Sequence, residues 1–263
     1  FVSAYTYLRY ADEIYKVETT VLINEDNSLG GTSDLLFDNI STNKKSLENK
    51  ELLIRSYPLV FKTLKDLRFD IAYFTEGNIK VTETFQTPII VRCRNTEALK
   101  NKSLKISIID RKNFSLIDLS TDVESFYKFN KKIIFNENEI SVNLNKKYLK
   151  NNLDELPSTI VRFYDLQSLS LLYQKKLDIS RVEKKSTVIN ISIKTESERK
   201  GVVFLNKLID NYIANEVEEK NLASTNTVAF INDQLLEIRD SLELIEYRIQ
   251  NFKNKNEITD IAL

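Results

Sequence analysis

From Glu198 to its end the chain contains no proline, and its only glycine there, Gly201, lies in the first turn of the helix that the pattern predicts. Because proline and glycine are the residues that break helices, we expect this region to be helical, with Thr195 or Ser197 as its cap. In its second half the apolar residues step by three and four without interruption. The seam that they form consists of Val228, Ile231, Leu235, Ile238, Leu242, Ile245, Ile249 and Phe252. A seam of this period predicts a coiled coil.

An earlier apolar stripe does not join this seam in phase. The stripe consists of Val202, Leu205, Ile209 and Tyr212. At ~100° per residue, Tyr212 and Val228 point about 160° apart. The polar stretch 221–227 (NLASTNT) lies between them, and its Ser and Thr side chains could cap a new helix. The sequence therefore predicts a break or a change of face near 221–227. A straight helix over 198–252 would measure about 80 Å, so we expect the second half to project from the rest.

The residue types in the seam bear on its partner. Leu235 and Leu242 fall at the a positions of the heptad, and Ile231, Ile238 and Ile245 fall at the d positions. In parallel coiled coils this arrangement favours bundles of more than two helices. The alternative is a single antiparallel partner helix that follows Leu263. The heptad pattern alone does not decide between pairing within a chain and pairing between chains.

The residue types that are missing exclude several kinds of chemistry. The chain has no histidine, one cysteine (Cys93) and four glycines. It therefore lacks histidine-based catalytic triads, zinc sites built from imidazole or several thiolates, and glycine-rich phosphate-binding loops. Its 38 basic and 38 acidic residues give zero net charge, which argues against nucleic acid as a ligand. We therefore expect no catalytic residue, metal site or cofactor here, and we predict that Cys93 is a small core residue.

The region before the long helix predicts an α+β body. Residues 15–23 alternate between apolar and polar side chains, as in a strand with one buried face. A helical period covers 46–67, with Ser46 as a possible cap, and Pro58 should kink this helix or start a second one. A shorter helix is expected near 145–152. The remaining strands of an antiparallel or mixed sheet are predicted at 69–75, 79–85, 89–94, 104–110, 115–119, 131–135, 139–144, 160–164 and 187–193.

The first ten residues, FVSAYTYLRY, are too few to span a bilayer, which needs about 20 apolar residues. Their aromatic side chains Tyr5, Tyr7 and Tyr10 surround Arg9, as at the interfacial end of a membrane helix. The alternative is a frayed helix start. We therefore expect three regions: residues 1–10 as the end of a first membrane helix, an α/β body over 11–196, and a long helix with a coiled-coil segment over 197–263.

Charge is distributed unevenly between the last two regions. Residues 197–263 carry 8 basic and 12 acidic side chains, a net charge of −4, so residues 1–196 carry +4. Basic residues are most frequent over 92–112. The simpler interpretation is that these side chains are solvated at strand ends and turns. The alternative is a mildly basic body that meets lipid phosphates or an acidic polymer.

The order of these elements resembles the periplasmic region of Wzz-type chain-length determinants. These are the polysaccharide co-polymerases, and they include the bacterial tyrosine-autokinase branch that serves capsule and exopolysaccharide export. The character of the sequence is that of Gram-negative, Bacteroidetes-like members. The stretches that carry the resemblance are YKVETTVLI (15–23), SYPLVFKTLKDL (56–67), FDIAYFTEG (69–77), FLNKLIDNY (204–212) and KNLASTNTVAFINDQL (220–235).

The resemblance implies an α/β body near the inner membrane, with a helix that extends into the periplasm. It also implies ring-shaped homo-oligomers that set polymer length and couple a polysaccharide polymerase to an outer-membrane export channel. Two flanking membrane helices are implied, of which Phe1–Tyr10 would be the end of the first. In the kinase branch a cytoplasmic P-loop domain follows the second span. It is not part of this chain, so we expect no enzyme activity here and leave a kinase in the full-length parent open.

An adaptor of the membrane-fusion type from an export system is the alternative class. Such proteins also combine a β-rich body with a coiled coil. They usually carry a glycine-rich, lipoyl-like half-motif, and the four glycines of this chain argue against one.

Overall fold

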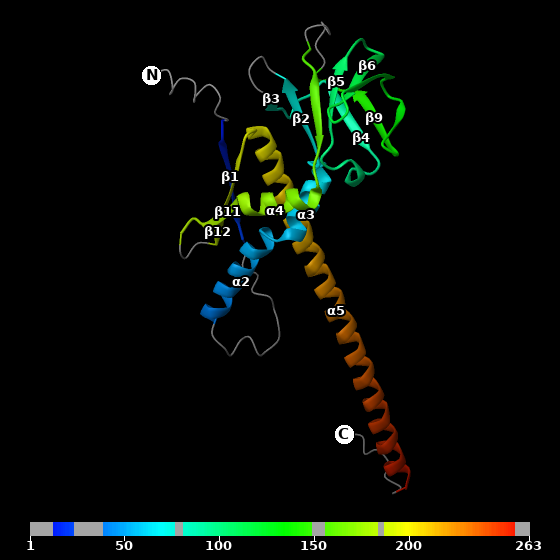
Figure 1. The fold of residues 1–263 in the computed structure, drawn as a ribbon. Helices are drawn as coiled ribbons and strands as arrows, with labels where there is room; N and C mark the ends of the chain where they lie inside the picture. Colours follow the sequence, from blue (N-terminus) through cyan, green and yellow to red (C-terminus); the bar gives the residue numbers. More distant parts are fainter. Residues whose placement is uncertain (1–12, 24–38, 77–80, 149–155, 184–186, 256–263) are drawn as a thin grey trace. The chain divides into compact units, whose positions relative to one another are not determined.

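The computed structural model describes residues 13–23, 39–76, 81–148, 156–183 and 187–255 (Figure 1). Two compact units are present, Phe1–Tyr212 and Ile213–Leu263, and each is described by itself. The helices are α2 (Asn39–Ile54), α3 (Tyr57–Leu67), α4 (Leu166–Lys176) and α5 (Glu198–Lys255), with a 3₁₀ turn at Glu97–Leu99. The strands are β1 (Tyr15–Leu22), β2 (Ile71–Glu76), β3 (Val81–Glu83), β4 (Ile89–Cys93), β5 (Ser103–Ile108), β6 (Asn113–Asp118), β7 (Val123–Lys128), β8 (Lys132–Phe135), β9 (Asn138–Leu144), β10 (Thr159–Phe163), β11 (Leu177–Arg181) and β12 (Val188–Thr195).

The α+β class is confirmed. The first unit contains three sheets, with strand orders β1-β12-β11, β3-β2-β10-β5-β6-β7 and β4-β9-β8. Every strand pair among the described residues is antiparallel. The neighbouring strands β5 and β6 are joined by a short turn, as the close spacing of the apolar stretches predicts, and a second short turn joins β6 to β7.

One hydrophobic core lies between the sheet β1-β12-β11 and the helices. The alternation in the sequence of β12 places Ile189, Ile191 and Ile193 on the same face, and all three are at most 1% exposed. They belong to the same buried cluster as Phe204 and Leu208 of α5. Sheet and helix therefore bury each other's apolar faces. In Figure 1, α3 and α4 lie beside the first turns of α5.

The predicted effect of Pro58 is confirmed. It occupies the first turn of α3, where its missing N–H costs no helical hydrogen bond. Ser56 precedes this helix in an extended conformation, so α2 and α3 are two helices. The start of the first helix was predicted too late, because α2 begins at Asn39 and not near Ser46.

A second core fills the space between the six-stranded sheet and the sheet β4-β9-β8. The six-stranded sheet supplies Leu104, Phe114 and Val161, and the three-stranded sheet supplies Ile89 and Val142. All five are fully buried. Strands β2 to β10 therefore form a layer structure with its own core, held together by apolar side chains from both sheets.

Two predictions about helices were wrong. Residues 145–148 of the helix expected at 145–152 form a turn, in which the Tyr148 N–H donates to the Asn145 carbonyl at 3.0 Å, and residues 149–152 lie outside the described residues. The break near 221–227 is also absent, because α5 runs unbroken from Glu198 to Lys255. The hydroxyls of Thr225 and Thr227 cap nothing. They donate to the carbonyls four residues earlier, at 2.8 and 2.9 Å, and so stay within the helical pattern.

No helix of the described residues is long and apolar enough to cross a membrane. The residues expected at a membrane interface, Tyr5, Tyr7, Arg9 and Tyr10, lie outside the described residues, so that prediction stays a prediction.

Gly201 allows the first turn of α5 to approach the sheet closely. A Cβ atom at this position would lie 2.8 Å from Cγ2 of Val17 and 2.8 Å from Cγ2 of Thr195. Alanine is ordinarily favoured over glycine inside a helix by about 1 kcal/mol. Here we expect Gly201→Ala to lower the free energy of unfolding by about 1–3 kcal/mol instead, because two β-branched side chains must move.

Urea unfolding followed by circular dichroism measures this effect. The control introduces Gly201→Ala into the variant Val17→Ala, which lacks one of the two contacting methyl groups. In that background Gly201→Ala should lower the stability by less than it does in the unaltered chain. An increase in stability for Gly201→Ala would show that the close approach does not constrain the packing.

Candidate functional site

The seam predicted from the sequence lies on the distal part of α5 and is exposed. All eight of its residues are between 48% and 63% exposed, although all are apolar. Soluble chains seldom expose an uninterrupted apolar line of this length without a partner. The seam is therefore the best candidate for an assembly surface in the second unit.

Two further exposed apolar residues near the start of the unit lie on the same side of the helix as the seam. Ile213 and Val217 are 50% and 52% exposed. At ~100° per residue, Ile213 lies on the same side of the helix as Ile231, and Val217 lies about 20° from Val228. Asn221 and Ser224 occupy this side of the helix between Val217 and Val228, so the two apolar segments are separated by a polar stretch.

The opposite side of the same helix segment is mixed. Exposed apolar side chains also occur there, but they spread over about 120° of the helix and carboxylates such as Asp233 and Asp240 separate them. They are Leu222, Phe230, Leu236, Leu244 and Tyr247. The segment thus has one continuous apolar face and a second, weaker one. The off-seam Arg239 contacts Asp240 at 3.3 Å and Glu243 at 4.0 Å, as expected of a solvated surface.

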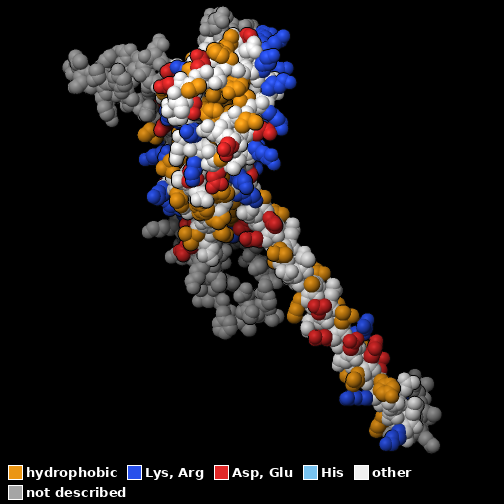
Figure 2. All heavy atoms as spheres, turned by 45° about the vertical axis from the view of Figure 1, so that its right-hand side comes forward, with side chains coloured by type: hydrophobic (Ala, Val, Ile, Leu, Met, Phe, Trp, Pro, Cys, Tyr) orange, Lys and Arg blue, Asp and Glu red, His pale blue; other side chains and the backbone are white. Residues whose placement is uncertain are grey.

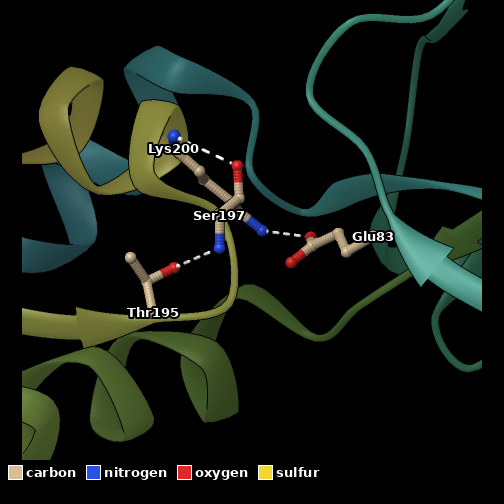
Figure 3. A network of polar contacts seen from close by, with 4 residues as sticks. All are labelled: Glu83, Thr195, Ser197 and Lys200. Carbon is tan, nitrogen blue, oxygen red and sulfur yellow. Dashed lines mark hydrogen bonds and ion pairs between the residues drawn. The ribbon is translucent and has the colours of Figure 1, made fainter. Parts of the chain in front are cut away.

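A buried ion pair in the first unit connects α5 with the β-rich part. Lys200 Nζ lies 2.5 Å from a carboxylate oxygen of Glu83 on β3, and the two side chains are only 10% and 15% exposed (Figure 3). The ammonium group also lies 4.9 Å from the centre of the Phe69 ring. Ser197 accepts a hydrogen bond from the Lys200 N–H at 3.4 Å, as a helix cap does. The network therefore fixes the first turn of α5 against β3.

The hollow beside this pair has a volume of about 690 Å³. Its lining includes the apolar side chains of Phe69 and Ile90 together with Arg92 and the paired Glu83 and Lys200. Two members of the basic stretch 92–112 have partners elsewhere. Lys105 contacts Glu76 at 2.6 Å, and Lys102 donates to the Ser120 hydroxyl at 3.3 Å. These contacts stabilise the β-rich part.

The shifted pKa values in the first unit have local structural causes. Burial raises the pKa of the Cys93 thiol, whose Sγ donates to the Asn95 carbonyl at 3.1 Å, so the thiol is kept in its less nucleophilic form. Burial likewise raises the pKa of Tyr73 and of Tyr173. For Asp118 burial acts to raise the pKa, but hydrogen bonds from Ser120 outweigh it and the pKa lies below its usual value. Among the described residues no cluster of His, Cys, Asp or Glu could hold a metal ion.

Comparison with known proteins gives a weak similarity over the whole chain. No family model matches the sequence. The tyrosine-protein kinase wzc of Salmonella typhi is 23% identical over 284 aligned positions, which cover 99% of this chain and 36% of the kinase. Its counterpart in Salmonella typhimurium strain LT2 is 22% identical over the same coverage. The chain thus spans about a third of the length of these curated relatives.

The similarity agrees with part of what the sequence analysis expected. Both relatives are named tyrosine-protein kinases, and the resemblance found in the sequence includes a tyrosine-autokinase branch. The matched positions run along nearly all of the chain, body and long helix alike. The finding supports a relationship to this kind of protein.

Proposed function

We propose that this chain is the periplasmic oligomerisation scaffold of an inner-membrane polysaccharide co-polymerase, which regulates the chain length and export of a capsular polysaccharide or exopolysaccharide. In this proposal it acts together with a polysaccharide polymerase and an outer-membrane export channel. The observation that carries the proposal is the exposed apolar seam on α5. The whole-chain similarity to wzc supports it, and the sequence resemblance is the basis for the periplasmic location and the Bacteroidetes-like origin.

The seam offers enough apolar surface to drive helix association. Each of its residues is about half exposed. Burying the exposed half of a Leu, Ile or Val side chain contributes on the order of 1 kcal/mol. Eight such residues on one face can offset a substantial part of the entropy lost on association. A seam with leucine at a and isoleucine at d fits assemblies of more than two helices.

A ring also needs a second contact surface on each subunit. In a ring the two surfaces that meet differ, so each subunit must present both of them. The described part of the second unit offers two apolar faces on opposite sides of α5: the continuous seam, and the mixed face that includes Leu236 and Tyr247. This pair of faces suits a ring better than a two-fold dimer, which uses one self-complementary surface.

We assign no catalysis to this chain. Four glycines cannot build the phosphate-binding loop that a P-loop kinase requires. In our proposal the chain supplies geometry: the body positions neighbouring subunits, and the seam holds their helices together.

The test is the replacement of Leu242 by aspartate in the full-length protein that contains this chain. Leu242 is 54% exposed at the middle of the seam. A carboxylate there must be desolvated on association, so we expect the oligomer to dissociate or its subunit number to fall, with the helix content retained. The mass of the particle, measured in detergent and in lipid nanodiscs, reports this change.

The matched control is Ser241→Asp, which adds the same charge one residue away on an exposed polar position of the same helix. It should leave the particle mass unchanged. An unchanged mass for Leu242→Asp, or a strictly monomeric native protein in membranes, would refute the proposed scaffold.

A further inference from the structure

A second exposed apolar surface lies on the β-rich part of the first unit, between two sheet edges. Strand β7 is the last strand of the six-stranded sheet, and β8 is the last strand of the sheet β4-β9-β8. The short segment 129–131 joins them. A hollow of about 810 Å³ lies there. It is lined by Ile109, Asn113, Phe126, Tyr127, Lys128, Lys131, Lys132, Ile133 and Ile134, and we call it the edge groove.

Two large apolar side chains of the edge groove are among the most exposed in the described chain. Phe126 is 69% exposed and Ile134 is 81% exposed. The strand alternation explains why: Tyr127 and Ile133 point inward, where they pack against the second core. Ile109 adds a third apolar side chain that is 47% exposed. Exposed apolar side chains grouped in this way mark a contact site for a partner or a membrane.

The backbone around the edge groove is held in place. Phe129 is 5% exposed, and its ring lies 4.8 Å from that of Phe114. Its N–H donates to the Lys112 carbonyl at 2.9 Å, and the Asn130 N–H donates to the Val142 carbonyl at 2.9 Å. The turn between β7 and β8 is thus fixed to both sheets. The exposed side chains are presented by a preformed surface.

Positive charge accompanies these apolar side chains. Lys128, Lys131 and Lys132 line the edge groove, and no carboxylate does. Lys132 contacts Glu139 at 2.6 Å. Within the part of the chain that the structure describes, Lys128 and Lys131 have no ion pair. Figure 2 shows Lys and Arg side chains gathered along one edge of the β-rich part, with apolar surface beside them.

The charge argues against a second copy of this chain as the occupant. Two copies meeting at this surface would place the same lysines opposite each other, which is unfavourable. Exposed edge strands otherwise invite such pairing, and lysines on an edge are a known means of preventing it. The lysines therefore favour an anionic occupant, and the exposed Phe126 and Ile134 favour one that is apolar below its surface.

We infer that the edge groove docks the body on a lipid surface with anionic headgroups. Phe126, Ile134 and Ile109 insert at the boundary between headgroups and acyl chains, and Lys128 and Lys131 contact the lipid phosphates. This inference goes beyond the proposed scaffold function and does not depend on the α5 seam. It gives the body a membrane contact of its own.

The chain contains no tryptophan, so a single introduced tryptophan reports its own surroundings. We expect the emission of Phe126→Trp to shift to the blue when vesicles containing phosphatidylglycerol are added, and to remain unchanged with phosphatidylcholine vesicles. The matched control is Leu52→Trp on α2, which replaces a side chain of similar exposure, 67%, outside the edge groove. Its emission should remain unchanged with both kinds of vesicle.

Sedimentation with the same vesicles measures affinity. Phe126→Ser/Ile134→Ser should weaken binding to phosphatidylglycerol vesicles about tenfold, and Lys128→Gln/Lys131→Gln should weaken it and reduce its salt dependence. Leu52→Ser/Leu171→Ser, which removes two exposed apolar side chains elsewhere, should have no effect. All these positions are exposed, and circular dichroism verifies that the variants fold.

Three outcomes would overturn the inference. One is the absence of binding to phosphatidylglycerol vesicles. Another is unchanged binding by Phe126→Ser/Ile134→Ser, which would place the lipid contact elsewhere in the chain. The third outcome combines two observations. The chain binds a soluble polyanion such as polyglutamate through the lysines and without Phe126, and the emission of Phe126→Trp does not shift to the blue on vesicles. The particle mass of Leu242→Asp is measured separately, so a failure here is distinguishable from a failure of the proposed scaffold.

Discussion

Replacement of Glu83 by glutamine should lower the free energy of unfolding by about 3–5 kcal/mol. The substitution keeps the shape of the side chain but removes its charge, so the Lys200 ammonium, whose side chain is 10% exposed, is left without a counter-charge. The loss of one partner of a buried ion pair costs about this much, because the remaining charge stays desolvated. Urea unfolding of the chain, followed by circular dichroism, measures the difference.

Two controls make this prediction specific. Glu139→Gln applies the same change to the pair with Lys132, whose side chains are 77% and 38% exposed, and should cost less than about 1 kcal/mol. The double variant Glu83→Gln/Lys200→Met removes both charges and should regain most of the lost stability. A double variant as unstable as Glu83→Gln alone would show that the lost stability comes from packing and not from an uncompensated charge.

Truncation of Phe204 to alanine should cost a similar amount, about 3–5 kcal/mol. Phe204 is completely buried where α5 meets the sheet, and its ring centre lies 4.8 Å from that of Tyr173. The surrounding side chains come from a strand and from other helices, so they cannot collapse fully into the space left behind, and a cavity remains. The midpoint of urea unfolding should therefore fall sharply.

Val202→Ala is the matched control for this truncation. Val202 lies on the same helix two residues earlier but is 40% exposed. Its replacement should change the stability by less than about 1 kcal/mol, since little buried surface is lost and alanine favours a helix. Equal losses for Phe204→Ala and Val202→Ala would mean that the first turns of α5 do not pack against the core as the structure shows.

Elements with a strong local signal could be predicted from the sequence. The alternation over 187–193 predicted β12, and Pro58 predicted the division between α2 and α3. The seam was predicted because its spacing is regular. Its residues are exposed because no apolar segment of the described chain packs against them.

Three missed elements have weak or contradictory local signals. In β7 the exposed Phe126 lies on the outer face, so its pattern does not separate apolar from polar. Helix α4 buries only Ser170 and Tyr173 while Leu171 and Leu172 are exposed, so its helical period is indistinct. Strand β11 follows α4 directly, at Leu177, with no turn residue between them. The N-terminal cap Asp165, which accepts from the Ser168 N–H at 3.0 Å, and the basic Lys175 and Lys176 in the last turn were the available signs of α4.

Features that depend on distant residues could not be predicted. Glu83 and Lys200 are 117 positions apart, and among 38 acidic and 38 basic residues no local rule selects this pair. The edge groove likewise arises where two sheets end beside each other, and only the strand order brings β7 and β8 to the ends of their sheets. Local pattern therefore predicts elements and exposed stripes, whereas buried charge pairs and grooves follow from the topology.

The pairing of β1 with β12 determines how the first unit would respond to mechanical load. Tyr15, at the start of β1, lies opposite Thr195, at the end of β12, so the two points where the chain enters and leaves this unit's sheet are neighbours. A tension that separated them would act at one end of the ladder and perpendicular to the strands. The eight residue pairs would then open in sequence, as in a zipper, and would not resist together as they do in shear. The ladder is therefore compliant toward a pull on both ends. Its opening would uncover the first core, to which Ile189, Ile191 and Ile193 of β12 belong, whereas the second core contains no residue of either strand.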